Sequence, residues 1–138
     1  MRQAHGKETV MKDILKRLKP FSPKMRRGYI DVTLPVVIYT DGGLLDLRIR
    51  KTGSGYKITC PRDLFAEANR DGAFYFSAFE RYGAGCHYGM KMRCGRIYKE
   101  YDSEQSMTVA LSEFARFFIL LDDFIMANDV IGNEENFV

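Results

Sequence analysis

The chain has 138 residues, of which 46% are hydrophobic and 13% aromatic, and its formal net charge is +3. This length and composition exclude an intrinsically disordered protein and predict a single domain over residues 1–138, with a core over 9–129 and a loose acidic tail over 130–138. Three cysteines without a CxxC pair argue against a disulfide framework. The sequence has no apolar run of about 18 residues and no N-terminal apolar leader, so we expect a cytoplasmic protein that binds no membrane.

Charge is distributed unevenly along the chain. Residues 1–51 contain 12 Lys and Arg against 5 Asp and Glu, whereas residues 101–138 contain one basic residue, Arg116, against 8 acidic ones. Such asymmetry is typical of proteins with separate basic and acidic surfaces. It predicts an acidic protein surface or a nucleic acid as the partner of the basic part. A homo-oligomer, in which the acidic part of one copy pairs with the basic part of another, is a further alternative.

The first predicted element is an amphipathic helix over residues 9–19. Its apolar side chains recur at helical spacing, and its lysines occupy the other side. Pro20 and Pro23 end this helix, because proline lacks an N–H donor and restricts the residue before it. Residues 24–28 follow as a basic connector.

Three strands form the next predicted unit, an antiparallel meander over residues 29–40, 44–51 and 56–60. Apolar and charged residues alternate along the second of them, which is the period of a half-buried strand. The Asp-Gly-Gly sequence at 41–43 tolerates the positive φ of a hairpin turn. Pro35 cannot donate to a sheet ladder, so it predicts a bulge, a break or an edge position.

Helices and a second hairpin complete the predicted fold. A short helix is expected over 61–69, another over 73–82, and a hairpin with strands over 86–94 and 96–101. Asp102 is the candidate cap of a long C-terminal helix. The apolar stripe of that helix consists of Met107, Ala110, Leu111, Phe114, Phe117, Phe118, Leu121, Phe124 and Ile125. The sequence thus predicts an α+β fold, in which an antiparallel sheet (three-stranded meander plus hairpin) packs against the N-terminal and the long C-terminal helix.

The cysteines and one histidine are candidates for a metal site or a nucleophile–base pair. Cys86, His87 and Cys94 lie close in sequence, and Cys60 would have to join them from another strand. Structural zinc sites use closely spaced ligand pairs, but seven residues separate Cys86 from Cys94. Neighbours in a strand also point to opposite faces, which keeps Cys86 away from His87. Thiols that serve only packing are therefore favoured, and no metal or cofactor is predicted.

Two carboxylates on the first hairpin are candidates for a metal-dependent nuclease. Asp31, Asp46 and the nearby Arg48 are similar to the paired carboxylates and basic residue of such enzymes. The expected Glu-x-Lys sequence is absent, and the solvated face of a hairpin explains the same residues. No catalytic residue is therefore assigned, and a nuclease-like enzyme ranks as the third hypothesis.

The basic residues are the strongest candidates for a functional surface. Phosphate or carboxylate groups of a partner require such neutralising charge, and tyrosines such as Tyr29 and Tyr39 could add stacking surfaces. The predicted partner-binding residues are Lys12, Lys16, Lys19, Lys24, Arg26, Arg27, Arg48 and Arg50.

Five features follow one another along the chain: Pro35, the turn at 41–42, the strand Gly55-Tyr56-Lys57-Ile58-Thr59, the pair Tyr82-Gly83 and the apolar helix over 111–125. In these features and in the order of its elements, over about residues 9–129, the chain resembles the DUF1828 family of uncharacterised bacterial and phage domains. The chain departs from the family after the third strand, where Cys60-Pro61-Arg62-Asp63 stands in place of an acidic-Gly turn. The resemblance implies a phage or mobile-element context and an accessory or counter-defence role, and it carries over no catalytic residue.

Together these observations predict a non-enzymatic binding protein, in the form of an inhibitor or accessory protein that occludes a protein partner. The alternative is a protein that binds nucleic acid or nucleotide through the basic N-terminal surface.

Overall fold

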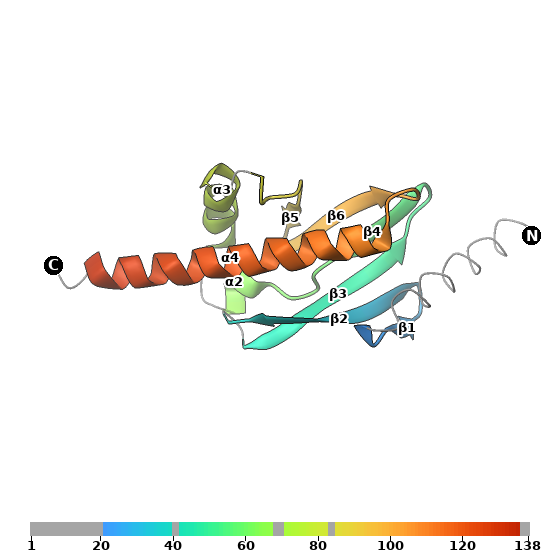
Figure 1. Ribbon diagram of the computed structural model, residues 1–138, viewed down its shortest axis with the longest axis horizontal. Helices are drawn as coiled ribbons and strands as arrows, with labels where there is room; N and C mark the ends of the chain where they lie inside the picture. The colour runs from blue at the N-terminus through green and yellow to red at the C-terminus, as the bar shows by residue number, and fades with distance from the viewer. Residues whose placement is uncertain (1–20, 40–41, 68–70, 83–84, 136–138) are drawn as a thin grey trace, which may run out of the picture.

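The computed structural model describes residues 21–39, 42–67, 71–82 and 85–135 and has an α+β fold (Figure 1). Its strands are β1 (Lys24–Arg26), β2 (Tyr29–Ile38), β3 (Gly43–Lys51), β4 (Gly55–Thr59), β5 (Lys91–Arg93) and β6 (Arg96–Asp102). Its helices are α2 (Leu64–Glu67), α3 (Gly72–Tyr82) and α4 (Met107–Glu135). The predicted fold class is confirmed, with the long C-terminal helix packed on an antiparallel sheet. The predicted helix over 9–19 lies outside the described residues.

One six-stranded sheet, in the order β1-β2-β3-β4-β6-β5, contains all of these strands. Every neighbouring pair is antiparallel, so the predicted meander and the second hairpin join edge to edge through β4 and β6. The register of β2 against β3 shifts between Leu34 and Val37, which confirms the irregularity predicted from Pro35. Gly42 takes a φ of +76° in the turn between these strands, as the predicted hairpin turn requires.

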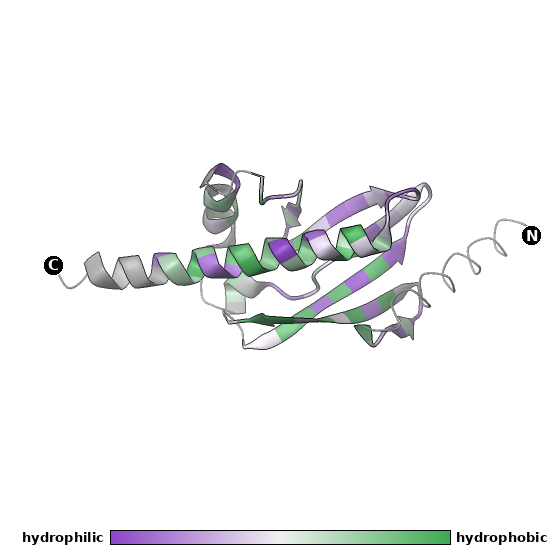
Figure 2. Ribbon diagram, in the orientation of Figure 1, coloured by the Kyte–Doolittle hydropathy of each residue, from purple (hydrophilic) through white to green (hydrophobic). Residues whose placement is uncertain are grey.

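Helix α4 covers one face of this sheet (Figure 1), and its buried side chains pack with those of the strands in a single hydrophobic core. The predicted stripe of α4 is buried in eight of its nine positions, and Phe124 is half-buried. Alternate residues of β2 and β3, such as Ile30 and Leu47, are buried against it. The hydropathy of β3 changes from residue to residue along the strand in Figure 2, as the period of two demands.

Helix α3 packs beside α4 through aromatic rings. Phe79 contacts Phe117 and Phe124 of α4 with ring centroids 5.4 and 5.7 Å apart. Asp71 accepts a hydrogen bond from the backbone N–H of Phe74, which caps the first turn of α3. The prediction that residues 73–82 are helical is confirmed.

Several predicted boundaries are wrong. The basic connector at 24–28 contains a strand, β1, because its residues pair with β2. Helix α2 begins at Leu64 rather than at 61, and strand β5 is limited to Lys91–Arg93, so Cys86 and His87 are not in a strand. Asp102 ends β6 and accepts hydrogen bonds from the N–H groups of Glu104 and Gln105, and it therefore caps a turn that precedes α4.

The C-terminal helix is longer than predicted. It continues to Glu135, so residues 130–135, predicted to belong to a loose tail, are helical. None of the helices in the described ranges is long and apolar enough to cross a membrane.

Candidate interaction surface on the open sheet face

The sheet face opposite α4 is rich in basic side chains. Because side chains alternate along a strand, the residues between the core positions share this second face, and all of its charged and aromatic side chains are half-buried or exposed. We call it the open face. Its cations are Lys24, Arg26, Arg48, Arg50, Lys57, Lys91, Arg93 and Arg96. Its acids are Asp31, Asp46, Glu100 and Asp102, and its other residues include Tyr29, Thr33, Thr59 and Tyr98.

Strand register brings distant parts of the sequence into one row across this face. The row runs through all six strands and consists of Lys24, Asp31, Arg48, Thr59, Tyr98 and Lys91. Five inter-strand spacings of about 4.8 Å make the row roughly 24 Å long. The open face is therefore wide enough to contact a macromolecular partner along a continuous strip.

Cations from neighbouring strands cover both tyrosine rings of the open face. The guanidinium carbon of Arg48 lies 4.2 Å from the centroid of the Tyr29 ring, and that of Arg50 lies 5.8 Å away. The ammonium of Lys57 lies 4.5 Å from the centroid of Tyr98. Such cation–π contacts hold long basic side chains in defined positions. They also reduce the ring surface available to a ligand.

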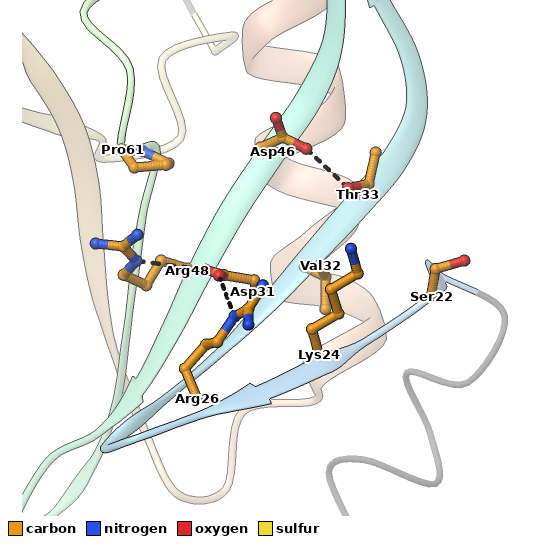
Figure 3. A pocket seen from close by; sticks show the side chains of 9 residues that line it. All are labelled: Ser22, Lys24, Arg26, Asp31, Val32, Thr33, Asp46, Arg48 and Pro61. Atoms are coloured by element: carbon orange, nitrogen blue, oxygen red, sulfur yellow. Dashed lines mark hydrogen bonds and ion pairs between the residues drawn. The ribbon is translucent and has the colours of Figure 1, made fainter.

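A shallow hollow of about 530 Å³ opens in this face where β1, β2 and β3 meet (Figure 3). Arg26 and Arg48 approach the Asp31 carboxylate through their Nε atoms, at 3.4 and 3.3 Å. The Thr33 hydroxyl donates a hydrogen bond of 2.7 Å to Asp46. The hollow is lined by Ser22, Lys24, Arg26, Asp31, Val32, Thr33, Asp46, Arg48 and Pro61.

The structure brings together four of the predicted partner-binding residues, namely Lys24, Arg26, Arg48 and Arg50, on the open face. Arg27 is exposed in the turn between β1 and β2. Lys12, Lys16 and Lys19 lie outside the described residues. Tyr39, predicted as a stacking surface beside Tyr29, is exposed just after β2.

Sequence reasoning missed four cations of the surface: Lys57, Lys91, Arg93 and Arg96. Each alternates with a core residue of its own strand, as Lys57 does with Ile58 and Arg96 with Ile97. Alternation in β4, β5 and β6 was therefore the signal that could have identified them.

The cysteines and His87 occupy different environments. Cys60 is buried and its thiol donates a hydrogen bond to the Arg62 carbonyl, Cys86 is half-buried, and Cys94 is exposed in the β5–β6 turn with a φ of +53°. The His87 ring lies against Phe76, with centroids 4.7 Å apart, and its Nε2 is buried without a hydrogen-bond partner among the described residues. Burial lowers the pKa of His87, and the nearby Glu80 carboxylate opposes this shift.

The two carboxylates considered for a nuclease are bound by other side chains. Asp31 faces two arginines and Asp46 accepts from Thr33. Across the described ranges, no three His, Cys, Asp or Glu side chains form a group that could hold a metal ion.

A polar cluster on the helix side of the sheet joins β6 to α4. The Lys99 ammonium donates to the Glu113 carboxylate over 2.7 Å and to the Tyr88 carbonyl over 2.6 Å. The Tyr101 hydroxyl also donates to Glu113, and burial together with this carboxylate raises the Tyr101 pKa. Burial raises the pKa of the stacked Tyr56 to about 12. Lys99 and Tyr101 both donate to Glu113, and the Tyr56 hydroxyl donates to the Gln105 carbonyl, so the cluster anchors the N-terminal half of α4.

Comparison of the chain with protein-family models, with curated proteins and with solved structures found no match in any of the three. The resemblance to the DUF1828 family therefore stays a prediction, and the case for a function rests on the geometry of the open face.

Proposed function

We propose that this protein is a non-enzymatic binding protein whose open face docks on an acidic surface of a protein partner and occludes it. The observation that carries the proposal is the charge of this face, which has eight cations, on five of the six strands, against four acids. A basic face attracts an acidic surface of a partner, and this electrostatic complementarity speeds association and fixes the register of the complex.

An acidic protein fits the details of the face better than a nucleic acid does. Proteins that bind single strands present aromatic platforms to the bases, but Tyr29 and Tyr98 are covered by cations. Four acids, Asp31, Asp46, Glu100 and Asp102, interrupt the basic surface, and they would repel a continuous phosphate backbone. A protein surface of mixed charge can place its own cations opposite these acids.

The resemblance to DUF1828 domains adds a biological setting to this proposal. It favours an inhibitor or accessory protein encoded by a phage or mobile element. We also propose a cytoplasmic location, because all three cysteines are thiols. A homo-oligomer is less favoured, since the exposed large apolar residues of α4 within residues 107–128, namely Val109, Ile119 and Met126, are separated along the helix.

A binding assay with defined probes tests the proposal. A labelled glutamate-rich peptide and a single-stranded oligonucleotide of equal charge would be titrated at about 50 and about 300 mM salt, where screening differs. We expect the peptide to bind more tightly and to weaken at the higher salt. A triple variant with Arg50→Glu, Lys91→Glu and Arg96→Glu should abolish peptide binding. Its melting temperature should stay unchanged, because exposed charges contribute little to stability. Arg116→Glu, on α4, is the matched control and should bind normally.

Two outcomes would overturn this assignment. If the oligonucleotide binds more tightly than the peptide, with a steep logarithmic salt dependence, the protein is a nucleic-acid binder. If neither probe binds at low salt, the open face is only a solvated surface.

Substitution of the candidate chemical groups separates binding from catalysis. We expect Cys86→Ala, His87→Gln and Cys94→Ser to retain peptide binding within about twofold, as residues outside an interface do. Once a partner is identified, its binding and its inhibition can be measured separately for each variant. If one of these variants binds the partner normally but its activity toward the partner falls about 100-fold, the protein acts by chemistry instead.

A further inference from the structure

Asp31 lies between two arginines that it does not saturate. Each guanidinium approaches one carboxylate oxygen through its Nε, at 3.4 Å for Arg26 and 3.3 Å for Arg48. Charge-assisted hydrogen bonds are usually about 2.7–2.9 Å long, and a guanidinium can bind a carboxylate through two N–H groups at once. The terminal nitrogens of both arginines have no hydrogen-bond acceptor in the described part of the chain. Asp31 therefore uses only part of the hydrogen-bonding capacity of both arginines, and a carboxylate that uses more of it can displace Asp31.

The surroundings of this pair favour an incoming anion. The Lys24 side chain lines the same hollow, and within the described ranges no carboxylate pairs with it (Figure 3). Asp46, the other acid of the hollow, is already bound by the Thr33 hydroxyl. Three cations against two carboxylates leave an excess of one positive charge, which one carboxylate would neutralise.

We propose that the hollow beside Asp31 is the anchor site of the open face, and that it receives an acidic side chain of the partner protein, whose carboxylate takes the place of Asp31 between Arg26 and Arg48. This inference rests on the function proposed above and adds the group that is recognised. Asp31 itself demonstrates that a carboxylate fits between the two guanidinium groups. Asp31 also acts as an internal competitor, because the partner must displace it from both arginines. Arg48 is held for this role by its contact with the Tyr29 ring.

Matched substitutions on one face test the inference, with the glutamate-rich peptide as the probe. Arg26→Gln and Arg48→Gln remove one charge each inside the hollow, whereas Arg93→Gln and Arg96→Gln remove one charge each at the far edge of the same face. We expect the first pair to weaken binding about tenfold, the effect of a lost charge-assisted hydrogen bond, and the second pair about twofold.

Removal of the Asp31 carboxylate, the internal competitor, should tighten peptide binding, whereas loss of either arginine should weaken it. Asp31→Asn should tighten peptide binding about fivefold, because the arginines then meet the peptide without prior displacement of a carboxylate. Glu100→Gln, which removes the same charge on the same face beside Lys57, is the control and should change binding by less than about twofold. Asp31 is partly exposed, and urea unfolding of each variant verifies that its fold is retained.

The outcomes separate this inference from the proposed function. If the hollow and edge variants weaken binding equally, or if Asp31→Asn and Glu100→Gln tighten it equally, the open face binds by overall charge and the anchor site is disproved. If the unaltered protein does not bind the peptide at low salt, the proposed function itself fails and the anchor fails with it. If the hollow variants affect the oligonucleotide but not the peptide, the site recognises phosphate rather than carboxylate.

Discussion

The Asp122 carboxylate accepts a hydrogen bond from the backbone N–H of Tyr39, with the two atoms 2.8 Å apart. Asp122 is the one buried acid of the described chain and is 4% exposed. Tyr39 directly follows β2, so this bond fastens the second half of α4 to the end of the sheet. The polar cluster around Glu113 fastens the first half. The long helix is therefore fixed at two points along the face it covers.

Loss of the Asp122 carboxylate should loosen the second attachment. We expect Asp122→Ala to lower the free energy of unfolding by about 1–3 kcal/mol, the cost of a partly buried N–H left without its acceptor. Asp123→Ala removes an exposed carboxylate from the next position and should change it by less than about 0.5 kcal/mol. Urea unfolding measures both. Equal effects of the two substitutions would show that the bond does not hold α4.

Truncation of Phe118 should remove much of the core. Its side chain is 1% exposed and contacts Phe114 and Phe117. We expect Phe118→Ala to lower the free energy of unfolding by about 3–5 kcal/mol, through lost burial and a cavity. Ile119→Ala, at a position 44% exposed, should cost less than about 1 kcal/mol. A loss at Ile119 as large as that at Phe118 would mean that Ile119 is covered by another molecule.

A methyl group at Gly55 should disrupt the centre of the sheet. Gly55 is buried opposite Asp102 on β6, and a Cβ there would overlap the Tyr101 carbonyl oxygen. We expect Gly55→Ala to lower the free energy of unfolding by at least about 1–3 kcal/mol. Gly53→Ala, where no atom lies within 4 Å of the added Cβ, should shift it by less than about 1 kcal/mol. If both variants melt at the same temperature, β4 and β6 can separate enough to admit a side chain.

Elements with a strong local signal could be predicted from the sequence. The stripe of α4 and the alternation of β3 are periodic over many residues, so burial of Phe118 and Leu47 follows from the sequence alone. Strand β1 has no such signal, because three residues are too few for a period, and only its pairing with β2 makes it a strand. The cap predicted at Asp102 is wrong for a related reason. Gln105 follows Asp102 at the three-residue spacing of a capping box, but β6 extends to Asp102, and α4 begins only at Met107.

The candidate site was only partly predictable because it depends on strand register. The sequence placed Lys24 and Arg26 in a basic stretch near the N-terminus, and it predicted Arg48 and Arg50, on a separate strand, as extensions of the same surface. Nothing local in the sequence places Lys91 in the same row as Arg48. That relationship depends on three further strand pairings, which arise between residues distant in the chain.

The stability of the fold should fall in mild acid because of His87. Its ring lies among Phe76, Phe79 and Phe117, with centroids 4.7, 6.4 and 5.7 Å away, and burial lowers its pKa below the ordinary value of 6.5. The folded state therefore binds its proton at a lower pH than the unfolded state does. Below about pH 6.5 the unfolded state takes up more protons than the folded state. The free energy of unfolding therefore decreases as the pH falls from about 6.5 toward the lowered pKa of His87, and above about pH 6.5 this effect of His87 is absent.

Urea unfolding between about pH 7.5 and about pH 5, a range that spans the ordinary pKa of histidine, measures this effect. We expect the midpoint for the unaltered protein to fall across the range, and the fall to be smaller for His87→Gln, which cannot titrate. Cys86→Ala, at the adjacent position, should retain the full dependence. Carboxylates, which titrate mainly below about pH 5, add little in this window. If His87→Gln and the unaltered protein show the same slope, His87 is not held neutral among these rings, and the pH dependence has another source.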